Sequence, residues 1–446
     1  MDYYIPPSLK FAAGKLAFSR SRFRLETQGA TTVAPGNTLT IVCPENAILD
    51  LKSWRLMARV TTIKNGTISS KAPADFSSLI SSFSVFVGGV CVSQATNDYG
   101  TIARVLKLVK SNRDRDGSID GTLSHGQIDG NDTADDFHVA WTPQTGIFDG
   151  STRYLPTSLT GTVTITIQLN TNACLCFKED SAAFGTDFGA TSGKLANAQL
   201  GSFQLSEIYA TCDTINMSNG TYEAMLFDRL NSGETLPMVY KEYHTFRKSG
   251  ITSTSHEVQC AISSSSLDCL YTVMQYGNYN SVGINTRVLS GVSNNADANT
   301  SNALYFDAFN GTATKTVGTL KYQYFINSVP QSSVPGTVLD AAADLSLIGN
   351  RTTLHSMGHM VTALADFQAG KAIFPCVLNN TESPLNVRSG LDLRGSNSSC
   401  VVQFTNQTVP TASAAGQIPD NFTTLVISES SQIMHIGGGR QITIEY

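Results

Sequence analysis

The stretch Leu49-Asp50-Leu51 begins a strand-like run, and a similar stretch, Leu267-Asp268-Cys269, begins another about 220 residues later. After each stretch the chain repeats one order of patterns: a further strand with a following helix, then a pair of alternating β-runs. In the first half these patterns cover residues 83–92, 98–109, 162–169 and 203–212, and in the second half residues 319–327, 338–348, 400–408 and 424–433. The shared order predicts two similar β-sandwiches in one chain.

The length of the chain also favours two domains. At 446 residues it exceeds the roughly 250–300 residues that one hydrophobic core usually serves. Gly220, Gly233 and Pro237 interrupt the strand patterns near the middle of the chain. We therefore expect an N-terminal arm at residues 1–20, a first sandwich at 21–220 and a second sandwich at 221–446.

Strand patterns are more frequent than helical ones. In residues 162–169 threonine alternates with valine, isoleucine and leucine, which is typical of a half-buried strand. Helical spacing of apolar residues occurs at 98–109 and 338–348, and a third short helix is expected to follow His355, through Met360 to Phe367. These patterns predict an all-β fold with a few short helices in its loops.

The composition indicates a polar surface with few charges. Hydrophobic residues make up 41% and charged residues 15% of the chain, whereas an average soluble domain has about 25% charged residues. Such a surface suits a protein that lies beside copies of itself. The formal net charge of −5 argues against a general polyanion-binding protein.

Targeting and redox features are equally sparse. The beginning of the sequence has neither a basic start nor an apolar core, so we expect no secretory signal. The longest apolar run is about eight residues, far below the roughly 20 that span a bilayer. The nine cysteines form no Cys-x-x-Cys motif, and we expect mostly reduced thiols in a cytosol-like compartment.

The N-terminal segment is basic although the chain is acidic. Its basic residues are Lys10, Lys15, Arg20, Arg22 and Arg24. Aromatic and aliphatic residues are interleaved with these charges, so the segment is amphipathic. It could lie on a membrane, on nucleic acid or on a neighbouring subunit. An ordinary solvated terminus is the alternative.

One acidic loop has part of the spacing of a calcium-binding EF-hand. The candidate ligands are Asn112, Asp114, Asp116 and Asp120, which occupy the first, third, fifth and ninth positions of the motif. The twelfth position is Leu123, where the motif requires a bidentate glutamate, and glycines follow where a helix should begin. We therefore favour an acidic surface loop over a calcium site.

Other candidate sites are weaker still. His355 and His359 have a spacing that can bind zinc, but Ser356 replaces the glutamate of the protease motif. The glycines of Gly437-Gly438-Gly439-Arg440 precede a strand, so a tight turn is a better interpretation than a phosphate loop. With no Gly-x-Ser-x-Gly motif, we predict no catalytic residues, no cofactor and no enzymatic activity.

Several short motifs occur along the chain in a characteristic order. They are Pro6-Pro7, residues 22–26 with Ala34-Pro35-Gly36, Leu49-Asp50-Leu51, Val85-Phe86-Val87-Gly88-Gly89 with Tyr99-Gly100 and the following helix, and the strand after Gly437-Gly438-Gly439-Arg440. In this order they resemble the double jelly-roll major capsid proteins of icosahedral DNA viruses, and within them those of Polinton-like viruses and virophages. The resemblance covers essentially the whole chain, as an order and spacing of motifs.

This resemblance implies a fold of two tandem eight-stranded jelly-roll sandwiches. It implies a structural protein whose homotrimers present six similar barrels as a pseudo-hexagonal capsomer. Implied partners are neighbouring capsomers, minor capsid and penton proteins, and an internal membrane or the DNA genome, reached by an inward-facing basic arm. The polar stretches at 181–201 and 289–302 would form outer towers. The implied location is the virion, with assembly inside the host cell.

Two other classes of protein remain as alternatives. An extracellular β-sandwich adhesin or carbohydrate-binding fibre protein would have the same strand content, but it should also have paired cysteines or clustered exposed aromatic residues. The chain has two tryptophans, Trp54 and Trp141, far apart in the sequence. A two-sandwich hydrolase would need paired carboxylates on facing strands, which only a structure can test.

Overall fold

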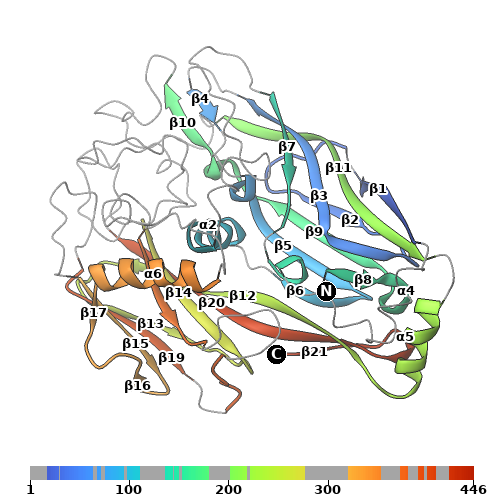
Figure 1. Cartoon of the computed structure of the whole chain (residues 1–446). Helices are drawn as coiled ribbons and strands as arrows, with labels where there is room; N and C mark the ends of the chain where they lie inside the picture. The colour runs from blue at the N-terminus through green and yellow to red at the C-terminus, as the bar shows by residue number, and fades with distance from the viewer. Residues whose placement is uncertain are drawn as a thin grey trace.

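In a computed structural model, the chain folds into two β-sandwiches that pack side by side (Figure 1). The structure describes residues 18–29, 31–63, 68–71, 76–94, 98–110, 136–143, 145–149, 153–179, 201–217, 221–276, 320–352, 372–379, 390–395, 399–407 and 421–446. The predicted third helix and nearly all of the two predicted polar excursions lie outside these residues. No helix in the described part of the chain is long and apolar enough to cross a membrane.

The first sandwich consists of two four-stranded antiparallel layers. One layer has the order β1-β11-β3-β7 and the other has the order β2-β9-β5-β6. The strands are β1 (Phe18–Gln28), β2 (Thr38–Val42), β3 (Ile48–Ile63), β5 (Ile80–Val87), β6 (Val90–Gln94), β7 (Asp136–Trp141), β9 (Val163–Leu169) and β11 (Ser202–Met217). The short strand β8 (Tyr154–Pro156) extends the first layer beside β3, and β4 (Ile68–Lys71) pairs separately with β10 (Cys176–Glu179).

The second sandwich repeats this topology. Its layers have the orders β12-β20-β14-β18 and β13-β19-β15-β16. The strands are β12 (Leu236–Ile251), β13 (His256–Cys260), β14 (Leu267–Tyr276), β15 (Lys321–Ile326), β16 (Val329–Pro330), β18 (Ile373–Val377), β19 (Cys400–Thr405) and β20 (Phe422–Ile436); β17 (Gly336–Thr337) and β21 (Ile442–Glu445) are added at β15 and β20. In each sandwich, strands one, eight, three and six face strands two, seven, four and five. This is the jelly-roll order, so the predicted fold class is confirmed.

One predicted element is wrong. The interpretation of residues 83–92 as a single strand overlooked Gly88 and Gly89, which turn the chain so that β5 and β6 form a hairpin. Both glycines have positive φ, 56° and 84°, in a region that other residues rarely adopt. A Cβ at Gly88 would lie 2.5 Å from the carbonyl oxygen of Thr160. Glycine is therefore required at this position both by the positive φ and by the close backbone contact.

The helices lie at the ends and between the sandwiches. They are α2 (Tyr99–Lys110), α4 (Thr157–Thr160), α5 (Thr221–Asn231) and α6 (Val338–Thr352), with one-turn helices η2 (Phe76–Leu79), η3 (Ile147–Asp149), η4 (Asn172–Cys174) and η7 (Gly438–Arg440). The predicted helices at 98–109 and 338–348 are therefore confirmed as α2 and α6. The predicted turn at residues 437–440 is confirmed by η7, in which Gly439 has φ 69°.

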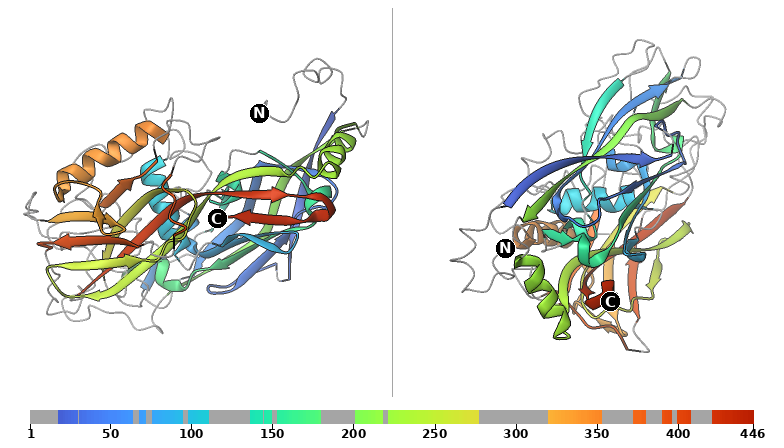
Figure 2. Two further views of the ribbon diagram at one scale, coloured as in Figure 1. Left: turned by 90° about the horizontal axis from the view of Figure 1, so that it is seen from below. Right: turned by 90° about the vertical axis from the view of Figure 1, so that its right-hand side faces the viewer.

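Each of the two hydrophobic cores contains side chains from both halves of the chain. Ile102, Val105 and Val109 of α2 belong to the second core, although α2 follows β6 of the first sandwich. Conversely, Met238 of β12 and Met434 of β20 belong to the first core. Figure 2 shows β20 and β21 running from the second sandwich along the first. Because apolar side chains of each half are buried in the other, we expect the two sandwiches to unfold together.

Candidate functional site

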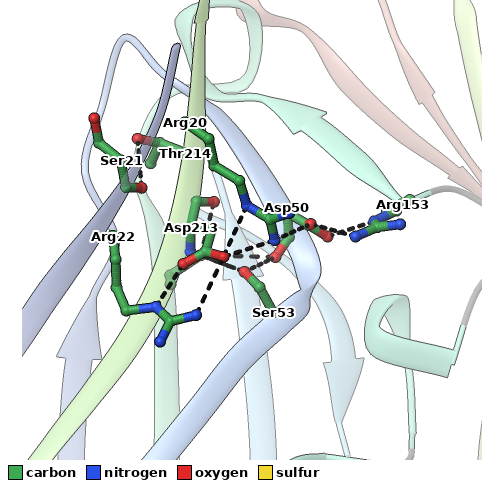
Figure 3. A network of polar contacts seen from close by, with 9 residues as sticks. Arg20, Ser21, Arg22, Asp50, Ser53, Arg153, Asp213 and Thr214 are labelled. Atoms are coloured by element: carbon green, nitrogen blue, oxygen red, sulfur yellow. Dashed lines mark hydrogen bonds and ion pairs between the residues drawn. The ribbon is translucent and has the colours of Figure 1, made fainter.

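A cluster of charged side chains lies on the outer face of the first sandwich, on strands β1, β11 and β3 and at the residue before β8 (Figure 3). We call it the arginine–aspartate cluster, and its members are Arg20, Arg22, Asp50, Arg153 and Asp213. Alternation along each strand explains its position. Leu49 and Leu51 of β3 and Cys212 of β11 are core residues, so the intervening Asp50 and the adjacent Asp213 point to the outer face.

Every charge in this cluster is paired. Arg153 donates two hydrogen bonds to Asp50, of 2.9 and 2.8 Å, in the bidentate geometry that suits a carboxylate. Arg20 bridges the two carboxylates, with Nε 2.9 Å from Asp213 and Nη2 3.1 Å from Asp50. Arg22 donates from Nε to Asp213 at 2.8 Å. Three guanidinium groups therefore hold two carboxylates, and both carboxylates are almost completely buried beneath them.

The electrostatics of the cluster suit a structural role. The hydrogen bond from Arg22 is the largest cause that lowers the pKa of Asp213, and it outweighs the opposite effect of burial; Arg20 adds to the lowering. A general acid needs a carboxyl group whose pKa is raised toward neutrality. Asp50 and Asp213 lie on neighbouring strands of one layer rather than on the facing strands that the hydrolase alternative requires, and the arginines keep Asp213 ionised.

A second cluster occupies the outer face of the second sandwich, and we call it the lysine–carboxylate cluster. Lys241 of β12 lies 2.5 Å from Asp268 of β14 and 3.8 Å from Glu429 of β20. Ser431 donates to Asp268 at 2.6 Å, and Tyr271 donates to Glu429 at 2.9 Å. The burial of Tyr271 raises the pKa of its hydroxyl well above the usual value, so this phenol remains a hydrogen-bond donor.

The two clusters occupy equivalent positions in the two sandwiches. In the first, Arg20 pairs with Ile215, two residues beyond Asp213; in the second, Lys241 pairs with Ser431, two residues beyond Glu429. Asp50 and Asp268 are the aspartates of the duplicated stretches with which the sequence analysis began. Leu155 pairs with Leu49, the neighbour of Asp50, and Leu391 pairs with Leu267, the neighbour of Asp268.

The equivalent clusters differ in exposure. The side chain of Lys241 is 12% exposed, whereas those of Arg20 and Arg22 are 49% and 72% exposed. The first half covers the second cluster, because the N–H of Gly146 donates to the carbonyl oxygen of Lys241 at 3.1 Å and η3 packs on β12.

The residues predicted as sites fall into two groups. Arg20, Arg22 and Arg24 lie on β1, where Arg20 and Arg22 bind aspartates and Arg24 stacks 4.0 Å from the ring centroid of Tyr209. The other predicted residues lie outside the described part of the chain: Lys10 and Lys15 of the arm, the calcium candidates Asn112, Asp114, Asp116 and Asp120, and the histidines His355 and His359. Among the described residues, no group of three or more His, Cys, Asp or Glu side chains could hold a metal ion.

Sequence reasoning did not identify the carboxylate partners of the arginines. Asp213 is 191 residues from Arg22 along the chain, so only sheet pairing brings them together. The duplicated aspartates, Asp50 and Asp268, were the available signal. Each is a charged residue between apolar residues at the beginning of a strand, and a buried charge usually pairs with an opposite charge.

No protein-family model matches the sequence, and no curated protein matches it. Solved structures do match. A chain of the PBCV-1 virus capsid is 11% identical, with a TM-score of 0.58 over 97% of both chains. The Faustovirus major capsid protein is 8% identical, with a TM-score of 0.56 over 95% of this chain and 91% of that one. A chain of the Sputnik virophage is 11% identical, with a TM-score of 0.55 over 96% of this chain and 88% of that one. These matches show that the chain has the fold of double jelly-roll capsid proteins.

Proposed function

We propose that this chain is a structural major capsid protein that builds the shell of an icosahedral virus as trimeric, pseudo-hexagonal capsomers. The observation that carries the proposal is the repetition of one eight-stranded order in two packed sandwiches, over the full length of a chain whose structural relatives are viral capsid proteins.

The repeated topology gives a physical reason for a trimer. Two similar sandwiches side by side make an elongated block, and three such blocks around an axis present six similar sandwiches. A block with a nearly hexagonal outline can tile a flat facet, although only one kind of chain is needed. The low content of charged residues, 15%, limits repulsion between copies.

The proposal extends to partners and location. Neighbouring capsomers would contact the outer edges of the trimer, and minor capsid and penton proteins would fill the positions that a hexagonal block cannot. The basic residues Lys10 and Lys15 precede β1 and would reach an internal membrane or the DNA genome. The place of action would be the virion, after assembly inside the host cell.

Two features support a structural role over the alternatives. Trp54 and Trp141 are both 1% exposed and pack edge to face within the first core, so neither offers the exposed ring that a sugar-binding surface would use. The paired carboxylates Asp50 and Asp213 are saturated by arginines, which does not suit acid–base catalysis.

The test is the mass and outline of the purified protein. Light scattering should give three times the 47.7 kDa of one chain, and negative-stain electron microscopy should show particles with a six-lobed outline. A stable monomer at the concentrations used for assembly would refute the proposal.

A further inference from the structure

The lysine–carboxylate cluster holds an amine against a carboxyl group inside the protein. Nζ of Lys241 lies 2.5 Å from Oδ2 of Asp268, and Cγ of Asp268 is one bond from that oxygen. The two side chains are 12% and 2% exposed, so little water surrounds the pair. The residues are 27 positions apart in the chain and meet because β12 and β14 flank β20 in one layer. An amine held this close to a carboxyl carbon has the proximity that favours intramolecular reactions.

A β-bulge aims Asp268 at the lysine. The register between β14 and β20 shifts between Leu267 and Cys269, so Asp268 is an extra residue on β14. Bulges re-aim side chains and are frequent beside active sites. The extra residue turns Asp268 toward Lys241, on the face of the layer that also carries Glu429. Three strands thus present one amine and two carboxyl groups to each other.

Glu429 is placed to carry a proton. Its Oε1 lies 3.8 Å from Nζ of Lys241, and its Oε2 accepts a hydrogen bond from Tyr271 at 2.9 Å. Burial raises the pKa of the Tyr271 hydroxyl, so the phenol keeps its proton and fixes the orientation of Glu429. A carboxylate in this position can take a proton from the amine and pass it to a leaving oxygen.

The two side-chain oxygens of Asp268 are held differently. Oδ2 accepts hydrogen bonds from Lys241 and, at 2.6 Å, from the hydroxyl of Ser431. Oδ1 accepts from the hydroxyl of Ser266 at 3.2 Å, and the Ser266 oxygen accepts from the N–H of Gly390 at 3.1 Å. A donor therefore lies at Oδ1, where negative charge develops when a nucleophile attacks Cγ. Oδ2 lies beside the groups that can supply a proton.

The equivalent cluster of the first sandwich has different chemistry. Its carboxylates are bound by guanidinium groups, those of Arg20, Arg22 and Arg153 (Figure 3). A guanidinium stays protonated in proteins, whereas a lysine amine that loses its proton becomes a nucleophile. A buried lysine in place of partly solvated arginines therefore distinguishes the second cluster.

We propose that Lys241 and Asp268 are a modification site, at which the folded chain joins them by an intramolecular isopeptide bond. A proton first passes from Nζ to Oδ2, which makes an uncharged amine and an uncharged acid. Nζ then attacks Cγ, Glu429 takes a second proton from the nitrogen, and this proton leaves with Oδ2 and the first proton as water. One C–N bond forms, one C–O bond breaks and one water is released, so no oxidant or reductant is needed.

The bond staples β12 to β14 across β20. Because its two residues meet only when the three strands are paired, the bond forms after folding. It closes a loop between residues 27 positions apart, which restricts the unfolded chain and so stabilises the folded one. The inference goes beyond the proposed function, since a folded single chain contains every group that the reaction uses.

The test is the intact mass of the denatured protein, followed by a peptide map. Wild-type protein incubated in its folded state should be lighter than its sequence mass by one water molecule. Digestion should give one branched peptide that contains both Lys241 and Asp268. Protein taken from inclusion bodies should have the full mass in urea and lose the water only after refolding. Reductant and denaturant should not restore the lost mass, because an amide bond survives both.

Matched variants separate the bond from a simple ion pair. Lys241→Arg keeps the positive charge but cannot form the amide, so it should have the full sequence mass. Glu429→Gln keeps an acceptor for Tyr271 but cannot carry the proton, and it should slow the loss of water at least about a hundredfold. Lys248→Arg is the control on the same strand. Its exposed side chain donates to the carbonyl oxygen of Glu257, and this variant should lose the water at the wild-type rate.

The wild type alone decides the main question, so a poorly folded variant leaves the test intact. Folded wild type that keeps its full sequence mass after prolonged incubation would overturn the inference. The same holds for a loss of water that persists in Lys241→Arg, and for a branched peptide that joins other residues. Loss of water by Glu429→Gln at the wild-type rate would overturn the role of Glu429.

Discussion

Acid should destabilise this protein through one buried histidine. His256 begins β13, where its ring stacks on Phe404 with 5.2 Å between centroids, and its Nε2 lies 3.0 Å from the hydroxyl of Thr424. Burial is the main cause that lowers the pKa of His256 to about 4, and the positive charge of Lys248 adds to it. In the unfolded chain the same imidazole has a pKa of about 6.5.

The sign and size of the effect follow from these two values. Between pH 6.5 and 4 the unfolded chain binds a proton that the folded chain does not, so the free energy of unfolding falls as the pH falls. The contribution of neutral His256 is fully present above about pH 6.5 and is lost by about pH 4. At about 1.4 kcal/mol per pH unit, the gap between the two pKa values is worth about 3 kcal/mol.

The assay is urea denaturation at one fixed protein concentration, at pH 7 and pH 4.5, for the wild type and His256→Gln. The wild type should lose about 2 kcal/mol more than the variant over this interval, because glutamine has no proton to gain. His435→Gln, which makes the same substitution at a more exposed histidine, is measured alongside as the control for the change of side chain. If His256→Gln loses as much as the wild type, the burial argument for His256 is wrong.

Two further predictions concern the duplicated cluster and the β5–β6 hairpin. Asp268→Asn should lower the free energy of unfolding by about 3 kcal/mol, since it leaves Lys241 buried without its nearest counter-charge. Asp50→Asn should lower it by about 1–2 kcal/mol, because the arginines that bind Asp50 remain partly solvated. Equal losses for the two variants, measured by urea denaturation of a dilute, dissociated sample, would contradict the difference in burial. Gly88→Ala should lower the free energy of unfolding by at least about 2 kcal/mol more than Gly89→Ala, although both glycines have positive φ. The reason is that a Cβ at Gly88 meets a backbone oxygen of α4, whereas one at Gly89 meets nothing within 4 Å. Similar melting temperatures for the two variants would refute this prediction.

The alternating patterns predicted most of the fold. Strand β9 was expected at 162–169 and occurs at Val163–Leu169, and α2 and α6 begin within a residue of their expected positions. Strands β7 and β18 were missed. Pro375 lies in the middle of β18, and proline usually argues against a strand because it lacks an N–H for the ladder. Among the described residues β18 is an edge strand that pairs with β14 alone, so the backbone N–H groups along its other edge need no partner strand.

The candidate site was harder to predict than the fold. Charge counting placed Arg20, Arg22 and Arg24 in a basic arm, while the structure places them on β1. Their carboxylate partners come from β3 and β11, and pairing of strands far apart in sequence depends on register, which local patterns do not reveal. The inward orientation of the arm and the calcium loop stay predictions, because their remaining residues lie outside the described part of the chain.

A cryo-electron microscopy map of the purified oligomer, reconstructed without imposed symmetry, tests the central claim most directly. The account predicts a closed ring of six similar sandwiches from three chains. A two-fold dimer that buries the same surface on both copies, or particles of a single chain, would contradict it.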